Sequence, residues 1–310
     1  MTTDERSGVS DFDPSNEETR AAVAALLERA ESASDHPPLA EPSRLAWAGA
    51  AGDFLGLVLR TDGAVAGYAQ LGWRDRSFTV EIALDPERPD SAATRRALLE
   101  AAASTAAHHG ATELRYWANR HDPDDDGIEA LGFRTERDLL QMRVPLPLDV
   151  DRRPIDAGFT FRPFRPGQDE AAWLEVNNRA FATHPEQGGW DVATLEAREK
   201  TSWFDPDGFV LCEAGGTLAG SCWTKVHADH QPPLGEIYVI SVDPAFQQRG
   251  LGRALALAGL DWLARRVAVG MLYVEKTNQG AVELYRSLGF TIDHVDRCYL
   301  LEGPGGRANG

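Results

Sequence analysis

The sequence has few cysteines and no long apolar run. Its three cysteines, Cys212, Cys222 and Cys298, are an odd number without CxxC spacing, so we expect no disulfide framework and no cysteine-based zinc site. No apolar stretch reaches the roughly 20 residues that span a bilayer, and residues 1–13 have neither the basic nor the apolar region of a signal peptide. These absences predict a cytoplasmic protein that binds no membrane.

The sequence also lacks an excess of positive charge. It carries 31 Lys and Arg against 48 Asp and Glu, a formal net charge of −17 at pH 7. Because binding of nucleic acid needs a basic face, we expect no nucleic acid partner. A local cluster of backbone N–H groups can still bind a phosphate, so the charge argues only against diffuse polyanion binding.

The two halves of the chain repeat one another. Residues 56–71 (GLVLRTDGAVAGYAQL) and 208–225 (GFVLCEAGGTLAGSCWTK) both have the pattern of a β-hairpin about an Asp-Gly or Gly-Gly turn. Each hairpin is followed by a strand ending in Asp-Pro, an Ala/Leu-rich helix, a short strand and a Leu-Gly-Phe triplet. The offset of about 155 residues is a domain length, so the sequence predicts two tandem copies of one α/β domain.

The boundary between the two copies falls near the middle of the chain. A Pro-rich, charged stretch there, VPLPLDVDRRPIDAG, has no hydrophobic periodicity and is typical of a linker. We therefore predict a disordered N-terminus at 1–13, an N-terminal domain at 14–148, a linker at 149–158 and a C-terminal domain at 159–303.

The C-terminal half contains a glycine loop between a strand and a helix. The strand Glu236–Val242 leads into QQRGLGR (Gln247–Arg253), and a helix follows. Such a turn directs successive backbone N–H groups and the positive end of the helix dipole at one place, and glycine lets a phosphate approach closely. The spacing is neither the Rossmann nor the Walker pattern, so it supports neither hydride nor phosphoryl transfer.

The order of these motifs resembles the GCN5-related N-acetyltransferase (GNAT) family. The shared features are the hairpin, the strand, Gln-x-x-Gly-x-Gly, the helix, Asn278, and Tyr285 three residues before Leu288-Gly289-Phe290. The resemblance implies an α/β (α+β) fold of two tandem domains, each a mixed, mainly antiparallel sheet flanked by helices. It also implies acetyl-CoA as the co-substrate. The implied acetyl-CoA contacts are Ile240, Ser241, Val242, Gln247, Gln248, Arg249, Gly250, Leu251, Gly252, Arg253, Asn278, Gln279, Gly280, Ala281, Val282 and Glu283.

Acetyl transfer to an amine needs a base for the ammonium, donors for the oxyanion and an acid for the leaving thiolate. Glu236 opens the strand before the loop and is the candidate base, although a solvated glutamate at a strand end is the alternative. Tyr285 lies where the family keeps a tyrosine beside the cofactor sulfur and is the candidate acid. Its alternative is a core tyrosine packed against Phe290.

The N-terminal half departs from this pattern. Its loop reads ERPDSAA (Glu87–Ala93), with no glycine and two carboxylates. Alignment of the repeats puts Phe78 opposite the candidate base and Ile128 opposite the candidate acid. We therefore expect only the C-terminal domain to be catalytic, and leave open whether the first domain still binds cofactor along Ile82–Leu84.

A sharper resemblance concerns the acceptor. The segments HPEQGGW, WFDPDG, WTKVH and LGEIYV look like a tandem branch of the family that acetylates the cysteine amine of cysteinyl-glucosaminyl-inositol. This implies a small thiol-sugar substrate contacted by Glu186, Lys225, Glu236, Tyr273 and, from the N-terminal domain, Glu41. Carboxylates and a phenol suit the hydroxyls and ammonium of such a substrate.

Other interpretations remain at this point. The acceptor could be an aminoglycoside, another small amine or a protein N-terminus, and the chain could instead be a non-enzymatic acetyl-CoA-binding protein. Lys225 could be a surface lysine. His227 and His230 form an HxxH without an evident third ligand, so we expect no metal. We expect a monomer, although no motif fixes the oligomeric state.

Overall fold

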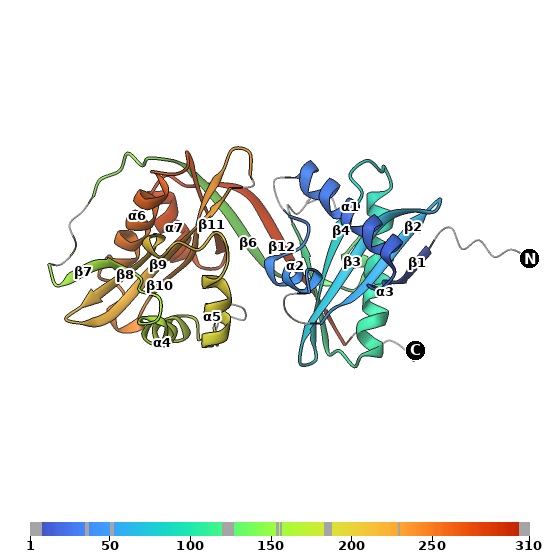
Figure 1. The fold of residues 1–310 in the computed structure, drawn as a ribbon, viewed down its shortest axis with the longest axis horizontal. Coiled ribbons are helices and arrows are strands. Elements are labelled where there is room, and N and C mark those ends of the chain that lie inside the picture. Colours follow the sequence, from blue (N-terminus) through green and yellow to red (C-terminus); the bar gives the residue numbers. More distant parts are fainter. Residues whose placement is uncertain are drawn as a thin grey trace, which may run out of the picture. The chain divides into compact units, whose positions relative to one another are not determined.

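The computed structural model describes most of the chain (Figure 1). The described residues are 8–34, 37–49, 53–119, 127–152, 155, 157–182, 188–228 and 230–303, without the side chain of Glu41. They form two compact units: unit 1 comprises Met1–Leu139 and Val295–Gly310, and unit 2 comprises Leu140–His294. Each unit is described by itself below.

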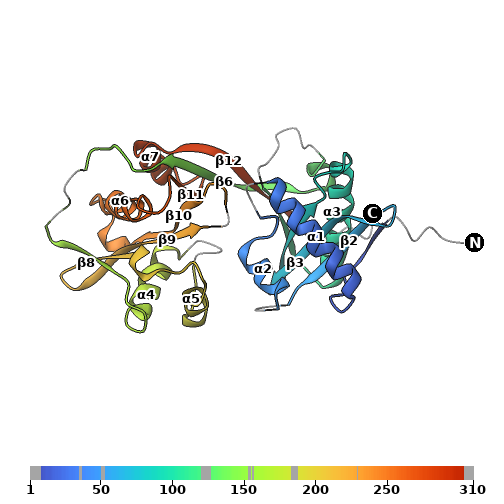
Figure 2. The ribbon, with the colours of Figure 1, turned by 45° about the horizontal axis from the view of Figure 1, so that its top comes forward.

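Unit 1 is a sheet with helices on both faces (Figures 1 and 2). Its strand order is β1, β2, β3, β4, β5, the second part of β12 and the first part of β6. The β4–β5 pair is parallel, whereas β1–β2, β2–β3, β3–β4 and β5–β12 are antiparallel. The elements are β1 (Gly8–Asp11), α1 (Glu17–Ala33), α2 (Glu41–Trp47), β2 (Leu55–Thr61), β3 (Ala64–Arg74), β4 (Ser77–Leu84), α3 (Ser91–His108), β5 (Glu113–Ala118), η1 (Glu129–Leu131), β6 (Arg134–Pro145) and β12 (Thr291–Glu302).

The alternation of side chains along β2 separates two cores in unit 1. Leu57 and Leu59 pack with Leu98 of α3, whereas Val58 between them packs with Leu26 of α1. This is the two-residue period of a strand that is buried on both faces. The sheet is therefore the middle layer of unit 1.

Unit 2 repeats this plan. Its strand order is the first part of β12, the second part of β6, then β11, β10, β9, β8 and β7. The β10–β11 pair is parallel, and β7–β8, β8–β9 and β9–β10 are antiparallel. The elements are β7 (Phe159–Pro163), α4 (Glu170–Ala180), α5 (Val192–Glu199), η2 (Pro206–Gly208), β8 (Phe209–Ala214), β9 (Thr217–His227), β10 (Leu234–Val242), η3 (Pro244–Phe246), α6 (Leu251–Leu263), β11 (Val269–Glu275) and α7 (Gln279–Ser287).

The predicted internal repeat extends to single contacts. Asp85, at the end of β4, accepts a hydrogen bond from the backbone N–H two residues later (3.2 Å) and forms an ion pair with Arg29 of α1 (3.2 Å). Asp243, at the end of β10, accepts the same bond (2.9 Å) and pairs with Arg179 of α4 (2.6 Å). The two halves therefore share connections as well as elements, and the predicted tandem α/β fold is confirmed.

Two strands are divided between the units. β6 begins in unit 1 and ends in unit 2, whereas β12 begins in unit 2 and ends in unit 1. Residues Arg297–Glu302 pair with Ala118–Glu113 of β5 inside unit 1. The sequence placed the boundary in the stretch 149–158, whereas the compact units divide within these two strands. Strand pairing joins residues far apart in the sequence, so a boundary read from local composition does not detect it.

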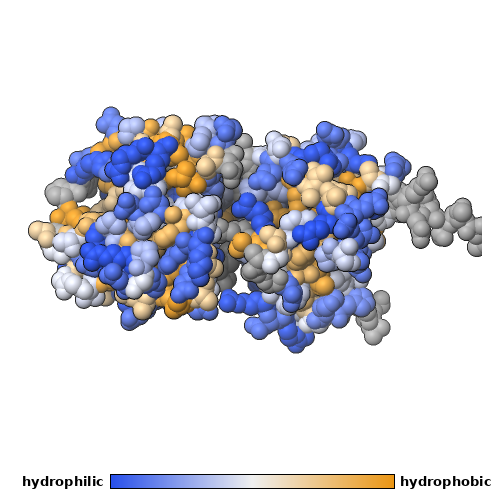
Figure 3. All heavy atoms as spheres, viewed as in Figure 1, coloured by the Kyte–Doolittle hydropathy of each residue, from blue (hydrophilic) through white to orange (hydrophobic). Residues whose placement is uncertain are grey.

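The surface shows no single large apolar area on the face drawn in Figure 3, where hydrophilic and apolar side chains alternate over both units. The large exposed apolar side chains among the described residues come from separate elements: Leu45, Trp73, Phe161, Val192 and Ile292. No helix of the described residues is long and apolar enough to cross a membrane.

Candidate functional site

The site of unit 2 begins where two parallel strands separate. β10 and β11 pair from Leu234 with Val269 to Ile237 with Leu272, but β10 continues to Val242. On its other side β10 stays paired with β9, with a register shift just after Ile237. The edge of residues 239–242 that faces β11 therefore has no strand partner among the described residues. Its backbone N–H and C=O groups can pair with an extended amide ligand, as an added strand would.

The side chains of this strand refine the predicted cofactor contacts. Ser241 is buried, and its hydroxyl lies 3.1 Å from that of Ser221, which accepts a bond from the indole N–H of Trp173 (2.9 Å). The Ser241 side chain thus belongs to the core, and only its backbone is available to a ligand. Ile240 and Val242 are half-buried.

The glycine loop ends at an uncapped helix. Gln248 (φ 62°) and Gly250 (φ 77°) both have left-handed backbone conformations, and Gly250 is the N-cap of α6 without any side-chain cap bond. Among the described residues, the first N–H groups of α6 therefore have no side-chain cap. A Cβ added at Gly252 would make only ordinary contacts, 3.7 Å from Leu284, whereas one at Gly250 would meet no atom within 4 Å. Open donors at a helix N-terminus form an anion-binding site.

Two arginines of the loop are anchored in unit 2. Arg253 donates through Nη1 to the hydroxyl of Ser287 in α7 (2.8 Å) and through Nη2 to the carbonyl of Asp151 (3.3 Å). The guanidinium of Arg249 lies 5.5 Å from the ring centre of Phe159. Arg253 therefore ties the start of α6 to α7, the second helix that was predicted to contact the cofactor.

The start of α7 is a capped helix end. The side-chain oxygen of Asn278 accepts a bond from the N–H of Ala281 (3.2 Å), and Val282 is buried. Gln279, Gly280 and Glu283 are exposed. Of the predicted contacts in this segment, Asn278 has a structural role as the cap and Val282 one in the core, while the exposed residues are accessible to a ligand.

Glu236 is not a solvated glutamate at a strand end. It is 8% exposed, and its Oε2 lies 2.7 Å from Nε2 of His227 on β9. Lys225 is its direct cross-strand partner. A carboxylate that is buried next to two basic side chains is placed to accept and release a proton.

Lys225 is likewise buried, at 8% exposure. Its Nζ lies 4.6 Å from the ring centre of Trp203 and 5.3 Å from that of Tyr238. The hydroxyl of Tyr238 accepts a bond from Nε of Arg198 in α5 (2.8 Å). The surface-lysine alternative is therefore wrong, because aromatic faces hold this ammonium inside the unit.

Tyr285 is a core tyrosine packed against Phe290, and its role as the acid stays a prediction. It is 5% exposed, and its ring packs 5.7 Å from that of Phe290. Burial, with a smaller contribution from Cys222, raises the pKa of Tyr285 above the ordinary value. The hydroxyl of Tyr285 therefore stays protonated at neutral pH. The described residues form no hydrogen bond with this hydroxyl, so it is available to a ligand.

Tyr273 lies on β11. Its hydroxyl accepts a bond from Nε2 of Gln141 (2.8 Å), and Oε1 of Gln141 accepts one from Nε of Arg143 (2.7 Å). Gln141, Trp203, Tyr238 and His227 were not predicted as part of the site. The hairpin register places His227 two residues beyond the partner of Glu236, and this register can be read only from the structure.

Two predicted substrate contacts cannot be placed. Glu186 and the side chain of Glu41 lie outside the described residues. Their roles stay predictions.

In unit 1 the two parallel strands separate in the same way, but the side chains that correspond to Lys225 and Glu236 are different. β4 and β5 pair only as far as Val80 with Tyr116, although β4 continues to Leu84. Across from Phe78, which aligns with the candidate base, lies Trp73, and the two rings are stacked 5.7 Å apart. An aromatic pair thus replaces the buried Lys225–Glu236 pair.

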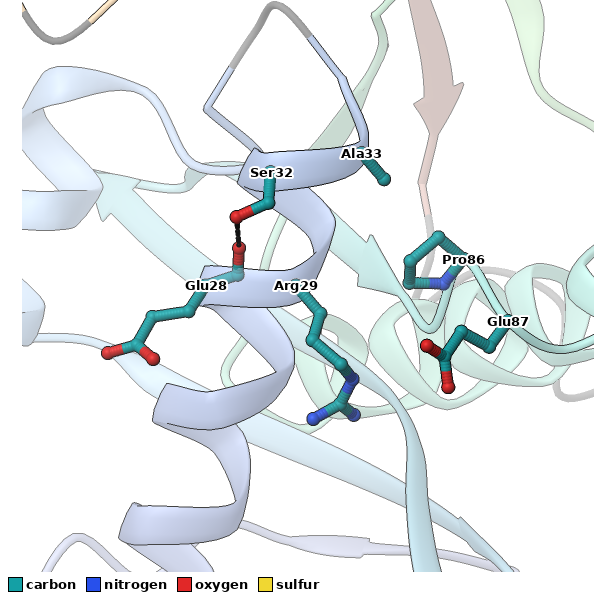
Figure 4. A pocket seen from close by; sticks show the side chains of 6 residues that line it. All are labelled: Glu28, Arg29, Ser32, Ala33, Pro86 and Glu87. Atoms are coloured by element: carbon teal, nitrogen blue, oxygen red, sulfur yellow. Dashed lines mark hydrogen bonds between the residues drawn. The ribbon is translucent and has the colours of Figure 1, made fainter.

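The loop after β4 borders a cavity of about 480 Å³ (Figure 4). Arg29, the basic side chain in its lining, is paired with Asp85. The complete lining is Glu28, Arg29, Ser32, Ala33, Pro86 and Glu87. Two carboxylates at this opening make it a poor place for a phosphate.

Comparison with known proteins agrees with this geometry. Residues 172–290 match the acetyltransferase (GNAT) family model. A mycothiol acetyltransferase of Acidimicrobium ferrooxidans is 47% identical over 283 residues, covering 88% of this chain and 91% of that protein. One of Nocardia farcinica is 40% identical over 294 residues, covering 92% and 95%. This chain belongs to the mycothiol acetyltransferase family.

The fold of the family member described here is that of tandem GNAT proteins. A tandem GNAT protein from the clavulanic acid biosynthesis pathway has a TM-score of 0.71 at 19% identity and covers 97% of this chain and 99% of that one. The predicted family, fold and acetyltransferase activity are thus confirmed, and the GNAT family membership supports acetyl-CoA as co-substrate. The individual roles of the site residues stay predictions.

Proposed function

We propose that this acetyltransferase moves the acetyl group of acetyl-CoA to the cysteine amine of cysteinyl-glucosaminyl-inositol, the last step of mycothiol biosynthesis. The observation that carries the proposal is the identity to mycothiol acetyltransferases over about nine tenths of the chain. The pair of Glu236 and Lys225 supports a small polar acceptor that bears an ammonium.

The acetyl-CoA site is proposed to be the opening of unit 2. The edge of residues 239–242 that faces away from β9 offers backbone groups to the amides of the pantetheine arm, and the start of α6 offers N–H groups to the phosphates. Arg249 and Arg253 add positive charge near this helix end. A backbone N–H close to Val242 is the proposed donor to the tetrahedral oxyanion.

Glu236 is proposed as the general base. An α-amine with a pKa of about 8 needs only modest help to lose its proton near neutral pH. A carboxylate that His227 holds at 2.7 Å is fixed in orientation before the acceptor arrives. Tyr285, which burial keeps protonated, is proposed to donate a proton to the leaving thiolate.

The acceptor contacts are proposed to be Lys225 and Tyr273, together with Glu186 and Glu41. Lys225 is a hydrogen-bond donor and Tyr273 both donates and accepts, so hydroxyl and amide groups of a pseudo-disaccharide can satisfy them. Unit 1 is proposed to be non-catalytic, because an aromatic pair stands where unit 2 has Lys225 and Glu236. We further propose a cytoplasmic monomer that needs no metal and binds neither nucleic acid nor membrane.

Mass spectrometry of candidate amines after incubation with the enzyme and acetyl-CoA tests the proposal. We expect the cysteinyl-glucosaminyl-inositol product to gain one acetyl group on nitrogen, with its thiol still reactive toward alkylation. Acetylation of an aminoglycoside or a peptide N-terminus in preference to this compound would contradict the proposed acceptor. Absence of CoA release with every amine would contradict the enzymatic function itself.

A further inference from the structure

The candidate base has a partner that no motif assigned. His227 is the last residue of β9, and its Nε2 lies 2.7 Å from Oε2 of Glu236 on β10. The register pairs Glu236 with Lys225 and Leu234 with His227, so the two side chains are diagonal neighbours on one face of the hairpin. Long side chains reach one another across this diagonal.

The proposed role of Glu236 as a base, which requires the ionised carboxylate, fixes the direction of the hydrogen bond. An ionised carboxylate has no proton to give, so Nε2 of His227 must donate. A donor aimed at a carboxylate favours its charged form and one orientation of its oxygens.

The other charged or titratable neighbours are few among the described residues. On β9, Lys225 lies directly opposite Glu236, with its ammonium over the rings of Trp203 and Tyr238. In the loop after β9, the ring of His230 lies 5.5 Å from that of His227. On β11, the position paired with Glu236 is the uncharged Met271.

We propose that His227 is a positioning residue for acetyl transfer, whose Nε2–H donates to the Glu236 carboxylate and holds it in one orientation. The proposal rests on the proposed role of Glu236 as the base. His227 is half-buried at the edge of the site and does not itself need to touch the acceptor. Its effect reaches the reaction only through Glu236.

Two substitutions separate this role from a merely structural one. His227→Phe keeps a flat ring but removes the donor, and His227→Gln keeps an N–H donor without the ring. We expect His227→Phe to lower kcat/KM for the acceptor about 10- to 100-fold at neutral pH, as for loss of a hydrogen bond to a charged group. The acidic limb of the kcat/KM profile should move to higher pH, because the carboxylate loses its donor. His227→Gln should recover most of the rate and return the limb toward that of the wild type.

Thermal unfolding and acetyl-CoA binding of both variants are measured as controls. The thermal midpoint and the acetyl-CoA affinity should stay close to wild type in both variants. A His227→Phe enzyme that is folded and keeps the acidic limb of the wild type would overturn the proposal. A folded His227→Gln enzyme as impaired and as shifted as His227→Phe would also overturn it.

Nitrogen NMR of the ¹⁵N-histidine-labelled full-length protein gives a test that needs neither a variant of His227 nor turnover. We expect Nε2 of His227 to carry a proton throughout pH 6–8, and this preference to weaken in Glu236→Gln. An unprotonated Nε2 in the wild type would overturn the proposal. If no acceptor is turned over, the proposed function fails, whereas the NMR result still decides the pairing.

Discussion

The polar side chains of Glu236 and Lys225 are buried in unit 2, and each has a partner there. Glu236 is bonded to His227, and Lys225 lies over the rings of Trp203 and Tyr238. Burying a charge without such partners costs several kcal/mol, so these contacts are a condition for the charged side chains to be there. The same contacts hold the two functional groups in fixed positions before any substrate binds.

Replacement of Glu236 by Gln tests the base. Gln has nearly the same volume and can still accept the bond from His227, but it cannot take up a proton. We expect kcat/KM to fall by about 10²–10⁴ at neutral pH, the usual contribution of a general base. Steady-state kinetics with CoA release as the readout measure this.

The loss in Glu236→Gln should shrink above about pH 8, where the acceptor amine deprotonates unaided. The acetyl-CoA affinity measured by calorimetry should not change. A variant within twofold of the wild type at neutral pH would remove Glu236 from the mechanism.

Replacement of Tyr285 by Phe tests the acid. The ring remains packed against Phe290, so folding should be preserved while kcat falls by about 10²–10⁴. Because burial raises the pKa of Tyr285, ionisation of this group should cause no loss of wild-type activity below about pH 10. A basic limb near pH 8 that disappears in Tyr285→Phe would contradict this account.

Motifs in the sequence identified Glu236, Lys225 and Tyr285 but not their surroundings. Strand-end position and spacing are local features, so the sequence could predict these residues as candidates. The sequence shows His227 only as half of an HxxH, because its contact with Glu236 depends on the register of a hairpin. The register is set by pairing and by the shift after Ile237, and neither leaves a local signal.

At the scale of the elements, a substitution at the start of α6 can test acetyl-CoA binding without a loss of protein stability. Gly252 lies in the first turn of α6, and a Cβ there would meet Leu284 at an ordinary 3.7 Å. Gly252→Ala should therefore leave stability unchanged or raise it by up to about 1 kcal/mol. The acetyl-CoA affinity should nevertheless fall about 5- to 150-fold, the effect of overpacking by 1–3 kcal/mol.

The matched control lies in the corresponding loop of unit 1. Ala92→Val changes an exposed residue near the start of α3 and should leave turnover unchanged. Calorimetry with acetyl-CoA and thermal unfolding measure the two variants side by side. Full acetyl-CoA affinity in Gly252→Ala would show that the loop does not approach the cofactor.

The elements themselves were largely predictable. The two hairpins, the Asp-Pro strand ends and the glycine loop all lie where turn chemistry and periodicity indicated. The separation of β10 from β11 after Ile237 was not predicted, because both strands continue with apolar residues that suit a paired strand equally well. Only the family resemblance pointed to residues 240–242.

At the scale of the whole molecule, β6 and β12 each contribute residues to both units. Leu140, Met142 and Val144 of β6 are buried and belong to unit 2, although they precede the predicted linker. Each fully buried side chain of this kind contributes about 1.5–3 kcal/mol, and a domain is stable by only about 5–15 kcal/mol. Loss of this segment would remove much of the stability of unit 2.

A fragment of residues 159–303 should therefore fail to fold. It lacks the end of β6, and the end of its β12 has no β5 to pair with. Circular dichroism and size-exclusion chromatography should show an unfolded or aggregated fragment, with the full chain as the folded control. A monomeric, cooperatively unfolding and active fragment 159–303 would mean that the strands are dispensable.

The sequence could not indicate these divided strands. β12 follows Leu288-Gly289-Phe290 as the last strand of its own half, and its apolar pattern shows that it is buried but not which strand it joins. Local chemistry thus predicted two copies of one domain, whereas long-range pairing determined which residues each compact unit contains.

The most direct test of the central claim compares two acceptors on the wild-type enzyme and on two variants. Free cysteine has the reactive amine but not the sugar, so its kcat/KM should be far below that of cysteinyl-glucosaminyl-inositol. Lys225→Met should lower kcat/KM for the conjugate about 10- to 150-fold, as for loss of a hydrogen bond from a charged group. Tyr273→Phe should lower it about 2- to 13-fold, as for loss of a hydrogen bond between neutral groups. Both variants should leave that of free cysteine nearly unchanged. Equal turnover of cysteine and the conjugate by the wild type would contradict the assigned acceptor.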